Sequence, residues 1–131
     1  MKLSTRTRYG TRLMVDLAQH YDQGPVQIGN IARRQDISIK YLEQIIIPLK
    51  KANLIKSVRG PKGGHMLTKS PDNIRIGEVV EILENGKNIS HCVKDPQKCD
   101  RYSECKVRDI WEMAADAMYE KLNSLRLSEL I

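Results

Sequence analysis

Apolar residues recur at helical spacing near the start of the chain, over the stretch STRTRYGTRLMVDLAQHY at residues 4–21. The positions that share one side of this helix are Tyr9, Leu13, Leu17, Ala18 and Tyr21. Ser4 is a suitable N-cap, and Gly24 with Pro25 ends the pattern. The residues therefore predict an amphipathic helix, and its outer face is basic.

Two shorter helical patterns follow, with a three-residue turn between them. The first covers residues 26–35, and the second begins after Ser38, a good N-cap, and runs to about Lys51. Two helices joined by such a short turn are typical of a helix-turn-helix. The next residues alternate as a strand, pass through the glycine-rich turn RGPKGG and return as a second strand at 65–69. A hairpin directly after a helix-turn-helix predicts a wing.

The second half of the chain ends in a long helical stripe. A helix is predicted over residues 74–84, and residues 87–104, which show no periodicity, are predicted to form a loop. Apolar residues then follow at three- and four-residue steps from Val107 to Leu125. The predicted fold class is mainly α with a small β-wing, a winged helix-turn-helix joined to a long C-terminal dimerisation helix. Its expected parts are a DNA-binding domain at 1–84, a cysteine-bearing loop at 85–104, and the dimerisation helix with the C-terminal tail at 105–131.

A long helix at the end of a small domain has to bury its apolar stripe. It can do so on the domain itself or on the same helix of a second chain. DNA-binding proteins of this size usually work as two-fold pairs, so we expect a homodimer. The residues expected in the dimer contact are Ile110, Trp111, Ala114, Met118 and Leu122.

Charge is distributed unequally between the two halves of the chain. The 131 residues carry a formal net charge of +6, but residues 1–62 hold 12 Lys and Arg against 4 Asp and Glu. This excess indicates contact with a polyanion such as double-stranded DNA, although a solvated basic surface is the plainer alternative. No 18-residue apolar run and no signal-peptide pattern occur, so we expect a cytoplasmic protein without a membrane partner.

The second helix of the helix-turn-helix has the side chains that a recognition helix needs. Leu42, Ile45 and Ile46 are expected to pack inward, which leaves polar side chains for base edges and phosphates. Gln44 suits adenine, and Glu43 suits cytosine or rejects a wrong base. The predicted DNA contacts are Ser38, Lys40, Tyr41, Glu43 and Gln44 in this helix, Arg59 and Lys62 at the wing tip, and Arg6, Arg8 and Arg12 on the first helix.

All three cysteines of the chain lie in the loop before the C-terminal helix, spaced C-x6-C-x5-C. Cys92, Cys99 and Cys105 are surrounded by lysine and arginine, and a helix N-terminus follows them; both features favour thiolates. An iron-sulfur cluster usually takes four such ligands, so three leave the set one short. A zinc site with His91 as fourth ligand, a redox switch made of two thiols, and inert cysteines are the alternatives.

With these motifs the chain resembles the winged-helix transcriptional regulators typified by IscR, NsrR and CymR, and in particular their iron-sulfur cluster-binding branch. The resemblance covers nearly the whole length. It rests on MKLSTRTRYGTRLMVDLA, on IARRQDISIKYLEQIIIPLKKANLIKSVRGPKGGHMLTKSP, and on three cysteines before a Trp-containing helix. It implies a homodimer with crossed C-terminal helices, a cluster on the three cysteines, and DNA contacts that include Arg59 and Gly60. Loss or oxidation of the cluster would then change the DNA affinity; CymR is a cluster-free relative.

Two positions depart from the pattern of this family. Arg108 stands where IscR-like members place a histidine ligand, and Arg8 stands where NsrR-like members offer an acidic residue from the partner chain. The candidates for a fourth ligand are therefore His91, Glu104 and Asp109. The spacing between the first two cysteines is one residue longer than in IscR, and a 2Fe-2S cluster is favoured slightly over 4Fe-4S.

The sequence therefore predicts a DNA-binding transcriptional repressor whose operator affinity depends on an iron-sulfur cluster that senses iron, redox state or nitric oxide. One alternative is a cluster-free winged-helix regulator that responds through thiols or zinc. Another is an iron-sulfur electron carrier or cluster-delivery protein, which would have no use for the polar recognition residues. Neither an enzyme nor a small-molecule substrate is expected, because the chain has no phosphate-binding glycine loop and its histidines are scattered.

Overall fold

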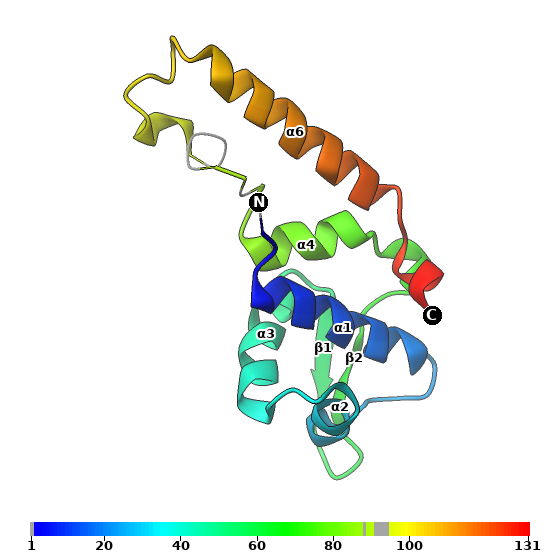
Figure 1. The fold of residues 1–131 in the computed structure, drawn as a ribbon. Coiled ribbons are helices and arrows are strands. Elements are labelled where there is room, and N and C mark those ends of the chain that lie inside the picture. Colours follow the sequence, from blue (N-terminus) through cyan, green and yellow to red (C-terminus); the bar gives the residue numbers. More distant parts are fainter. Residues whose placement is uncertain (1, 88, 91–94) are drawn as a thin grey trace.

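The computed structural model describes residues 2–87, 89–90 and 95–131, and Figure 1 shows their arrangement. The helices are α1 (Thr5–Gln19), α2 (Ile28–Gln35), α3 (Ile39–Lys51), α4 (Ile76–Glu84) and α6 (Lys106–Asn123). The antiparallel strands are β1 (Ile55–Val58) and β2 (Gly64–Leu67), and short 3-10 helices are η1 (Pro71–Asn73), η2 (Pro96–Lys98) and η3 (Leu127–Leu130). Helix-turn-helix, wing and long C-terminal helix follow in the predicted order, which confirms the fold class.

Local sequence signals set the ends of the first three helices. The Ser4 hydroxyl accepts a hydrogen bond from Thr7 N, and the Ser38 hydroxyl accepts one from Tyr41 N, as predicted for two N-caps. Asp36 ends α2 in the left-handed conformation, with a φ of 54°, and this produces the tight turn into α3.

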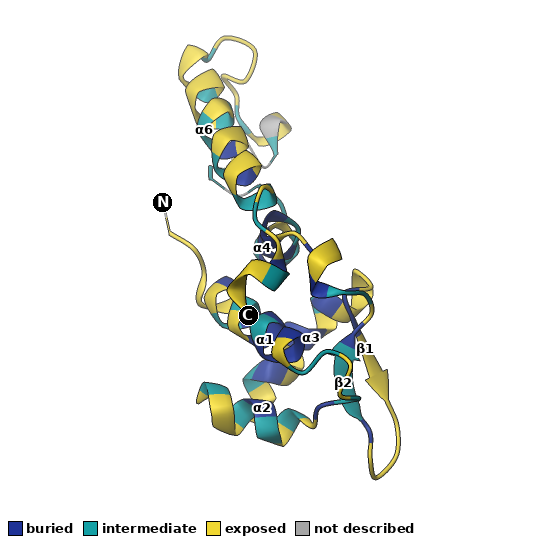
Figure 2. Cartoon of the chain, turned by 90° about the vertical axis from the view of Figure 1, so that its right-hand side faces the viewer, coloured by how far each residue is buried: buried dark blue, intermediate teal, exposed yellow. Residues whose placement is uncertain are grey.

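The hydrophobic core lies between α1, α3 and α4 and extends to the wing, as the buried residues in Figure 2 show. Leu13 of α1, Ile45 of α3 and Leu83 of α4 are fully buried. Gly10 lets α1 approach its neighbours closely, because a Cβ there would lie 2.4 Å from Leu83 Cδ1 and 3.1 Å from Ile45 Cγ2. Burial of this apolar surface is the main contribution that favours the fold.

The wing is tied to the start of α2 as well as to α3. Val26 N donates to His65 O, and His65 N donates to Val26 O, both at 2.8 Å. The helix predicted over residues 26–35 therefore begins two residues later, at Ile28. Val26 cannot belong to the helix because its backbone pairs with the free edge of β2.

The C-terminal end of the chain returns to the winged helix (Figure 1). Tyr119 of α6 and Leu127 of η3 are buried in the same core as α1 and α4. Ile76 N donates to Leu125 O at 2.9 Å, and Leu127 N donates to Ile74 O at 2.8 Å. The division of the chain into three parts stays a prediction, and the C-terminal tail packs against the winged-helix core. In the part of the chain that the structure describes, every helix is too short or too polar to span a membrane.

Candidate nucleic-acid interface and cysteine segment

Helix α3 presents a polar face to solvent. Its buried residues include Leu42, Ile45 and Ile46, as predicted. The predicted DNA contacts that are exposed here are Ser38, Lys40, Glu43 and Gln44. Because the buried positions recur at three and four residues, the polar side chains gather on the opposite side of the helix. Side chains able to read base edges are thus held on a helix that is packed firmly from behind.

Tyr41 is half-buried, unlike the other predicted contacts in α3. Its ring meets Tyr9 of α1 edge-on, with 5.9 Å between the ring centroids. The Arg12 guanidinium carbon lies 5.4 Å from the Tyr9 ring centroid, and the same guanidinium donates to Gln35 at the end of α2. These contacts join α1 to both helices of the helix-turn-helix.

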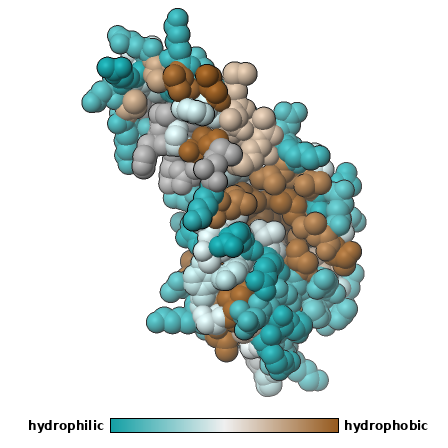
Figure 3. All heavy atoms as spheres, viewed as in Figure 1, coloured by the Kyte–Doolittle hydropathy of each residue, from teal (hydrophilic) through white to brown (hydrophobic). Residues whose placement is uncertain are grey.

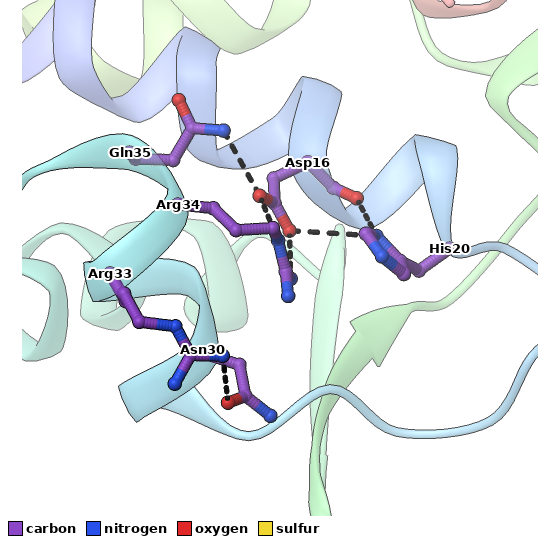
Figure 4. Close-up of polar contacts among 6 residues, drawn as sticks. All are labelled: Asp16, His20, Asn30, Arg33, Arg34 and Gln35. Atoms are coloured by element: carbon purple, nitrogen blue, oxygen red, sulfur yellow. Dashed lines mark hydrogen bonds and ion pairs between the residues drawn. The ribbon is translucent and has the colours of Figure 1, made fainter.

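A buried carboxylate fixes α2 against α1 (Figure 4). The Asp16 side chain is 1% exposed and accepts hydrogen bonds from Arg34 Nη2 at 2.7 Å and Arg34 Nε at 3.0 Å. Gln35 Nε2 donates to Asp16 at 3.0 Å, and His20 Nδ1 lies 3.6 Å from it. Burial alone would raise the pKa of Asp16, but these donors and the charge of Arg34 hold it below its ordinary value. The ionised carboxylate therefore positions the helix that precedes α3.

Positive charge lies at the tip of the wing, where Arg59, Gly60 and Lys62 are all exposed. Gly60 adopts a φ of 109°, which other residues rarely tolerate. A Cβ on Gly63 would lie 2.1 Å from Val58 O, so the turn is too tight for a larger residue there. The glycines of RGPKGG thus form a narrow turn that carries two cations away from the core.

The two predicted DNA contacts at the start of α1 lie in different surroundings. Arg6 donates from Nε and Nη2 to Leu83 O, at 2.9 and 2.7 Å, in the last turn of α4. Arg8 is exposed, and its guanidinium donates to the Thr5 hydroxyl at 3.3 Å. The Arg6 guanidinium already satisfies a helix C-terminus, so Arg8 has more freedom to reach a phosphate.

The start of α1 is also linked to the end of α4 through a carboxylate. Ser4 N and Ser4 Oγ both donate to Glu84 Oε1 at 2.8 Å. Burial would raise the pKa of Glu84, but hydrogen bonds from Thr7 and Ser4 hold it below its ordinary value. Ser4, Arg6, Leu83 and Glu84 together form what we name the α1–α4 clasp. The clasp lies where α4 ends and the chain continues toward the cysteines.

Residues 89–105 form the cysteine segment. Cys92 and the candidate ligand His91 lie outside the described residues. Cys99 and Cys105 are half-buried free thiols, and Cys105 is the N-cap residue of α6. Within the described ranges, no three His, Cys, Asp or Glu side chains are grouped so that they hold a metal ion. Because Cys92 is outside those ranges, the three-cysteine site stays a prediction.

Arg108 is held firmly at the start of α6. Its guanidinium carbon lies 4.0 Å from the Tyr102 ring centroid, and Nη1 donates to Glu112 Oε1 at 2.9 Å. Nη2 donates to Asp109 Oδ1 at 3.3 Å, while the buried Nε has no partner among the described residues. Of the candidates for a fourth ligand, Glu104 and Asp109 are exposed. Asp109 pairs with Arg108, so its carboxylate already has a cationic partner.

The N-terminal half of α6 carries an uncovered apolar surface, and hydrophobic side chains reach the surface in this part of the molecule in Figure 3. Ile110 is 58% exposed, Trp111 is 44% exposed, and Met113, which the predicted stripe did not include, is 71% exposed. The predicted dimer residues that are half-buried instead are Ala114, Met118 and Leu122. The stripe is therefore divided, because Met118 and Leu122 pack against the core of their own chain.

Comparisons with known proteins identify similar regulators along the whole chain. The family model described as "Rrf2: Iron-dependent Transcriptional regulator" matches residues 3–131. Protein rrf2 of Nitratidesulfovibrio vulgaris, strain Hildenborough, is 45% identical over 131 residues, which are 100% of this chain and 87% of that relative. The structure of T. potens IscR is similar, with a TM-score of 0.80 and 37% identity over 99% of this chain and 85% of that chain. CymR, "the Global Cysteine Regulator of B. subtilis", has a TM-score of 0.81 and 35% identity over 99% and 95% of the two chains.

These matches decide two of the predictions made from the sequence. Relatives named IscR and CymR confirm the resemblance to this class of winged-helix regulators. The family model describes a regulator of transcription, and the relatives named IscR are regulators of the same kind. This confirms the prediction that the chain is not an enzyme.

Proposed function

Because this chain belongs to the Rrf2 family of transcriptional regulators, we propose that it is a dimeric repressor whose affinity for a DNA operator depends on an iron-sulfur cluster. The observation that carries the proposal is the exposed polar face of α3, held with a basic wing on one packed core. Transcriptional regulation through a DNA-binding winged helix is the general function of the family. The repression, the dimer and the cluster are the proposed parts.

Sequence reading is assigned to the exposed side chains of α3. Gln44 is suited to a bidentate contact with adenine, and Glu43 is suited to accept from cytosine or to reject a wrong base. Lys40 and Ser38, near the N-terminus of the same helix, are placed for phosphates or base edges. Tyr41 is largely committed to Tyr9, so we assign it a supporting contact with the DNA backbone.

Phosphate contact is assigned to the wing tip and to Arg8. Arg59 and Lys62 are exposed on the narrow turn, and cations of this kind enter narrow minor grooves. Each phosphate contact should add roughly −0.9 to the slope of log affinity against log salt concentration on duplex DNA. A salt titration of operator binding measures the slope, and a flat response would contradict the assignment.

The cluster is assigned to Cys92, Cys99 and Cys105, with the fourth ligand drawn from His91, Glu104 or Asp109. The thiols of Cys99 and Cys105 are free, and the N-terminus of α6 beside Cys105 favours a thiolate. Thiolates are the usual ligands of iron-sulfur clusters, and a 2Fe-2S cluster is proposed ahead of 4Fe-4S. The description of the family as iron-dependent supports iron at this site rather than zinc.

The α1–α4 clasp provides a route from the cysteine segment to the DNA. The chain leaves α4 directly after Glu84, and Glu84 and Leu83 are hydrogen-bonded to the start of α1. Leu83 and Ile45 of α3 both lie beside Gly10. A displacement at the end of α4 would therefore be passed to α1 and α3, because a close-packed core transmits such a shift.

The test compares the chain purified without oxygen with a Cys92→Ala, Cys99→Ala, Cys105→Ala triple variant. Absorption spectra with iron and sulfide analysis report the cluster, and titration of selected duplex DNA reports operator affinity. We expect visible charge-transfer bands in the wild type only, and a different operator affinity in the triple variant. A colourless wild type without iron or sulfide, even after anaerobic reconstitution, would overturn the cluster and leave the DNA-binding assignment standing.

A cluster-free regulator that responds through its thiols is the second candidate. CymR of B. subtilis is similar over nearly the whole chain, and S. aureus CymR has been solved in an oxidized form at 33% identity. Half-buried free thiols at Cys99 and Cys105 suit this function as well. Family membership favours either regulator over an electron carrier, and we infer a cytoplasmic location because the operator DNA lies there.

A further inference from the structure

An apolar side chain lies within the polar face of α3. Ile47 is 65% exposed, although its neighbours Ile45 and Ile46 are buried. Each residue of a helix is rotated by about 100° from the one before it, so three consecutive isoleucines cannot all face the core. Ile47 therefore lies on the side of α3 opposite to Leu42, where the exposed Gln44 also lies.

The surroundings of Ile47 are those of a base-reading surface. Ile47 follows Lys40 by seven residues and Gln44 by three, which places the three side chains along one row of the helix. Ile39 is also exposed, but it precedes Ile47 by eight residues. At this separation the two side chains point about 80° apart around the helix axis, and Ile39 lies nearer the buried side. The C5-methyl group of thymine is an apolar group on the major-groove edge of the bases, and apolar side chains recognise it.

We propose that Ile47 reads a thymine of the operator by packing against its C5-methyl group, and that it sets sequence preference together with Gln44. The inference rests on the proposed DNA-binding function and deepens it. A β-branched side chain in a helix has one strongly preferred χ1 rotamer, so Ile47 loses little conformational freedom when it makes this contact. The operator therefore contains an A·T pair under the middle of α3.

Ile47 could instead be covered by a second copy of this chain. The charges near Ile47 do not favour such a protein contact. Lys40, Lys50 and Lys51 are exposed on α3 near Ile47. A protein contact would have to remove these cations from water, whereas DNA offers phosphates that pair with them. The exposed apolar residues of α6 belong to its N-terminal half, which extends away from α3 in Figures 1 and 2.

The test removes one methyl group from the DNA. A preferred duplex is first selected from random sequences with the wild-type protein, and each thymine is then replaced in turn by deoxyuridine, which lacks only the C5-methyl group. Replacement of the thymine under Ile47 is expected to weaken binding about fourfold, because the complex then no longer buries one methyl group away from water.

Protein variants connect that methyl group to Ile47. Ile47→Ala is expected to bind the thymine duplex about fourfold or more weakly and to bind the thymine and deoxyuridine duplexes equally. Ile47→Val keeps the branched carbon and should keep part of the preference for thymine. Ile131→Ala removes an exposed isoleucine beyond η3, which packs on α1 and η1, and should discriminate as the wild type does. Thermal unfolding and sedimentation of each variant report the fold and the subunit state.

The outcomes separate this inference from the proposed function. If no thymine replacement weakens binding, or if Ile47→Ala weakens binding but retains the full preference for thymine over deoxyuridine, the inference is wrong and DNA binding still stands. A changed subunit state in Ile47→Ala would also overturn it, because Ile47 would then belong to a contact between copies. A wild-type protein that selects no duplex would overturn the proposed function itself.

Discussion

Helices α1 and α6 both carry apolar residues at helical spacing, but the fold uses them differently. α1 has 15 residues and buries Thr7, Gly10, Leu13, Met14, Asp16, Leu17 and Ala18. α6 has 18 residues and buries Ala115 and Tyr119. In Figure 2 most of the N-terminal half of α6 is exposed, whereas α1 lies against the core. An apolar stripe at helical spacing therefore predicts a helix without showing what covers it.

The difference follows from where each helix lies. α1 is covered by α2, α3, α4 and β2, so most of its apolar side and even a carboxylate are removed from water. The C-terminal end of α6 packs against α4. The N-terminal half of α6 extends beyond the core, toward the cysteine segment. The first helix stabilises one chain, while the second leaves an apolar surface uncovered, and we propose that a partner chain covers it next to the proposed sensing site.

The largest expected effect compares one buried and one exposed side chain of these helices. Leu13→Ala in α1 should lower the free energy of unfolding by about 2–5 kcal/mol, because it removes buried methyl groups and leaves a cavity. Met113→Ala in α6 should change it by about 0.5 kcal/mol or less. Urea unfolding at a protein concentration low enough for monomers measures both. Similar losses for the two variants would contradict the comparison.

The next effect concerns the proposed partner of α6. Trp111→Ala should weaken the dimer by about 2 kcal/mol, or about thirtyfold, because exposed aromatic residues at the centre of an interface often dominate its energy. Sedimentation equilibrium over a range of protein concentrations measures the dissociation constant of the dimer. Tyr21→Ala, at a half-buried aromatic residue after α1, is the control and should leave the subunit equilibrium unchanged. Unaltered dimerisation in Trp111→Ala would assign the dimer to another surface.

A smaller effect concerns the ion pair between α1 and α2. Arg34→Ala should lower the free energy of unfolding by about 1–2 kcal/mol, because Asp16 stays buried without its charged donor. The Arg34 side chain is partly exposed to solvent, so water screens part of its attraction to Asp16 and the loss stays below that of a fully buried pair. Arg33→Ala is the matched control: this exposed neighbour donates to Asn30 at 3.1 Å and should cost less than about 0.5 kcal/mol. Chemical denaturation distinguishes the two, and equal losses would show that the pair is not structural.

The smallest expected effect is a pH dependence. The folded-state pKa of Asp16 is below its ordinary value, so this stabilisation is present above about pH 4 and is lost as the pH falls through the folded-state pKa. The wild type should have a higher free energy of unfolding than Asp16→Asn at pH 7, and this difference should shrink as the pH falls toward 3. Asp116→Asn on α6 should show little difference at either pH, because that carboxylate is exposed. A constant difference for Asp16→Asn between pH 7 and pH 3 would contradict the assignment.

The elements that sequence predicted well depend on local interactions. Ser4 and Ser38 cap their helices within three residues, and the turn at Asp36 needs only a residue that tolerates a positive φ. The start of α2 was misplaced because Val26 pairs with His65, a residue 39 positions later. Spacing within a short window cannot reveal a pairing between distant segments.

The candidate site also has some features that local sequence predicted and others that only the fold shows. The polar residues of α3 were predicted because the buried positions leave one face free, and Ile47 was available to the same reasoning from three isoleucines in a row. Arg6 was predicted at a phosphate, yet its guanidinium donates to Leu83 O, 77 positions away. The sequence shows that a basic residue lies on the outer face of a helix. Which carbonyl accepts its hydrogen bonds depends on how α1 and α4 cross in the fold.

The sequence by itself determined the order of the elements, the wing with its cations, the gathering of the cysteines and the family, since these depend on residue types and short-range spacing. Tertiary structure decided which apolar stripe is covered, which arginine is already occupied and how α4 is fastened to α1. Those features arise from contacts between residues far apart in the chain, and their energies depend on burial that only the packed fold creates.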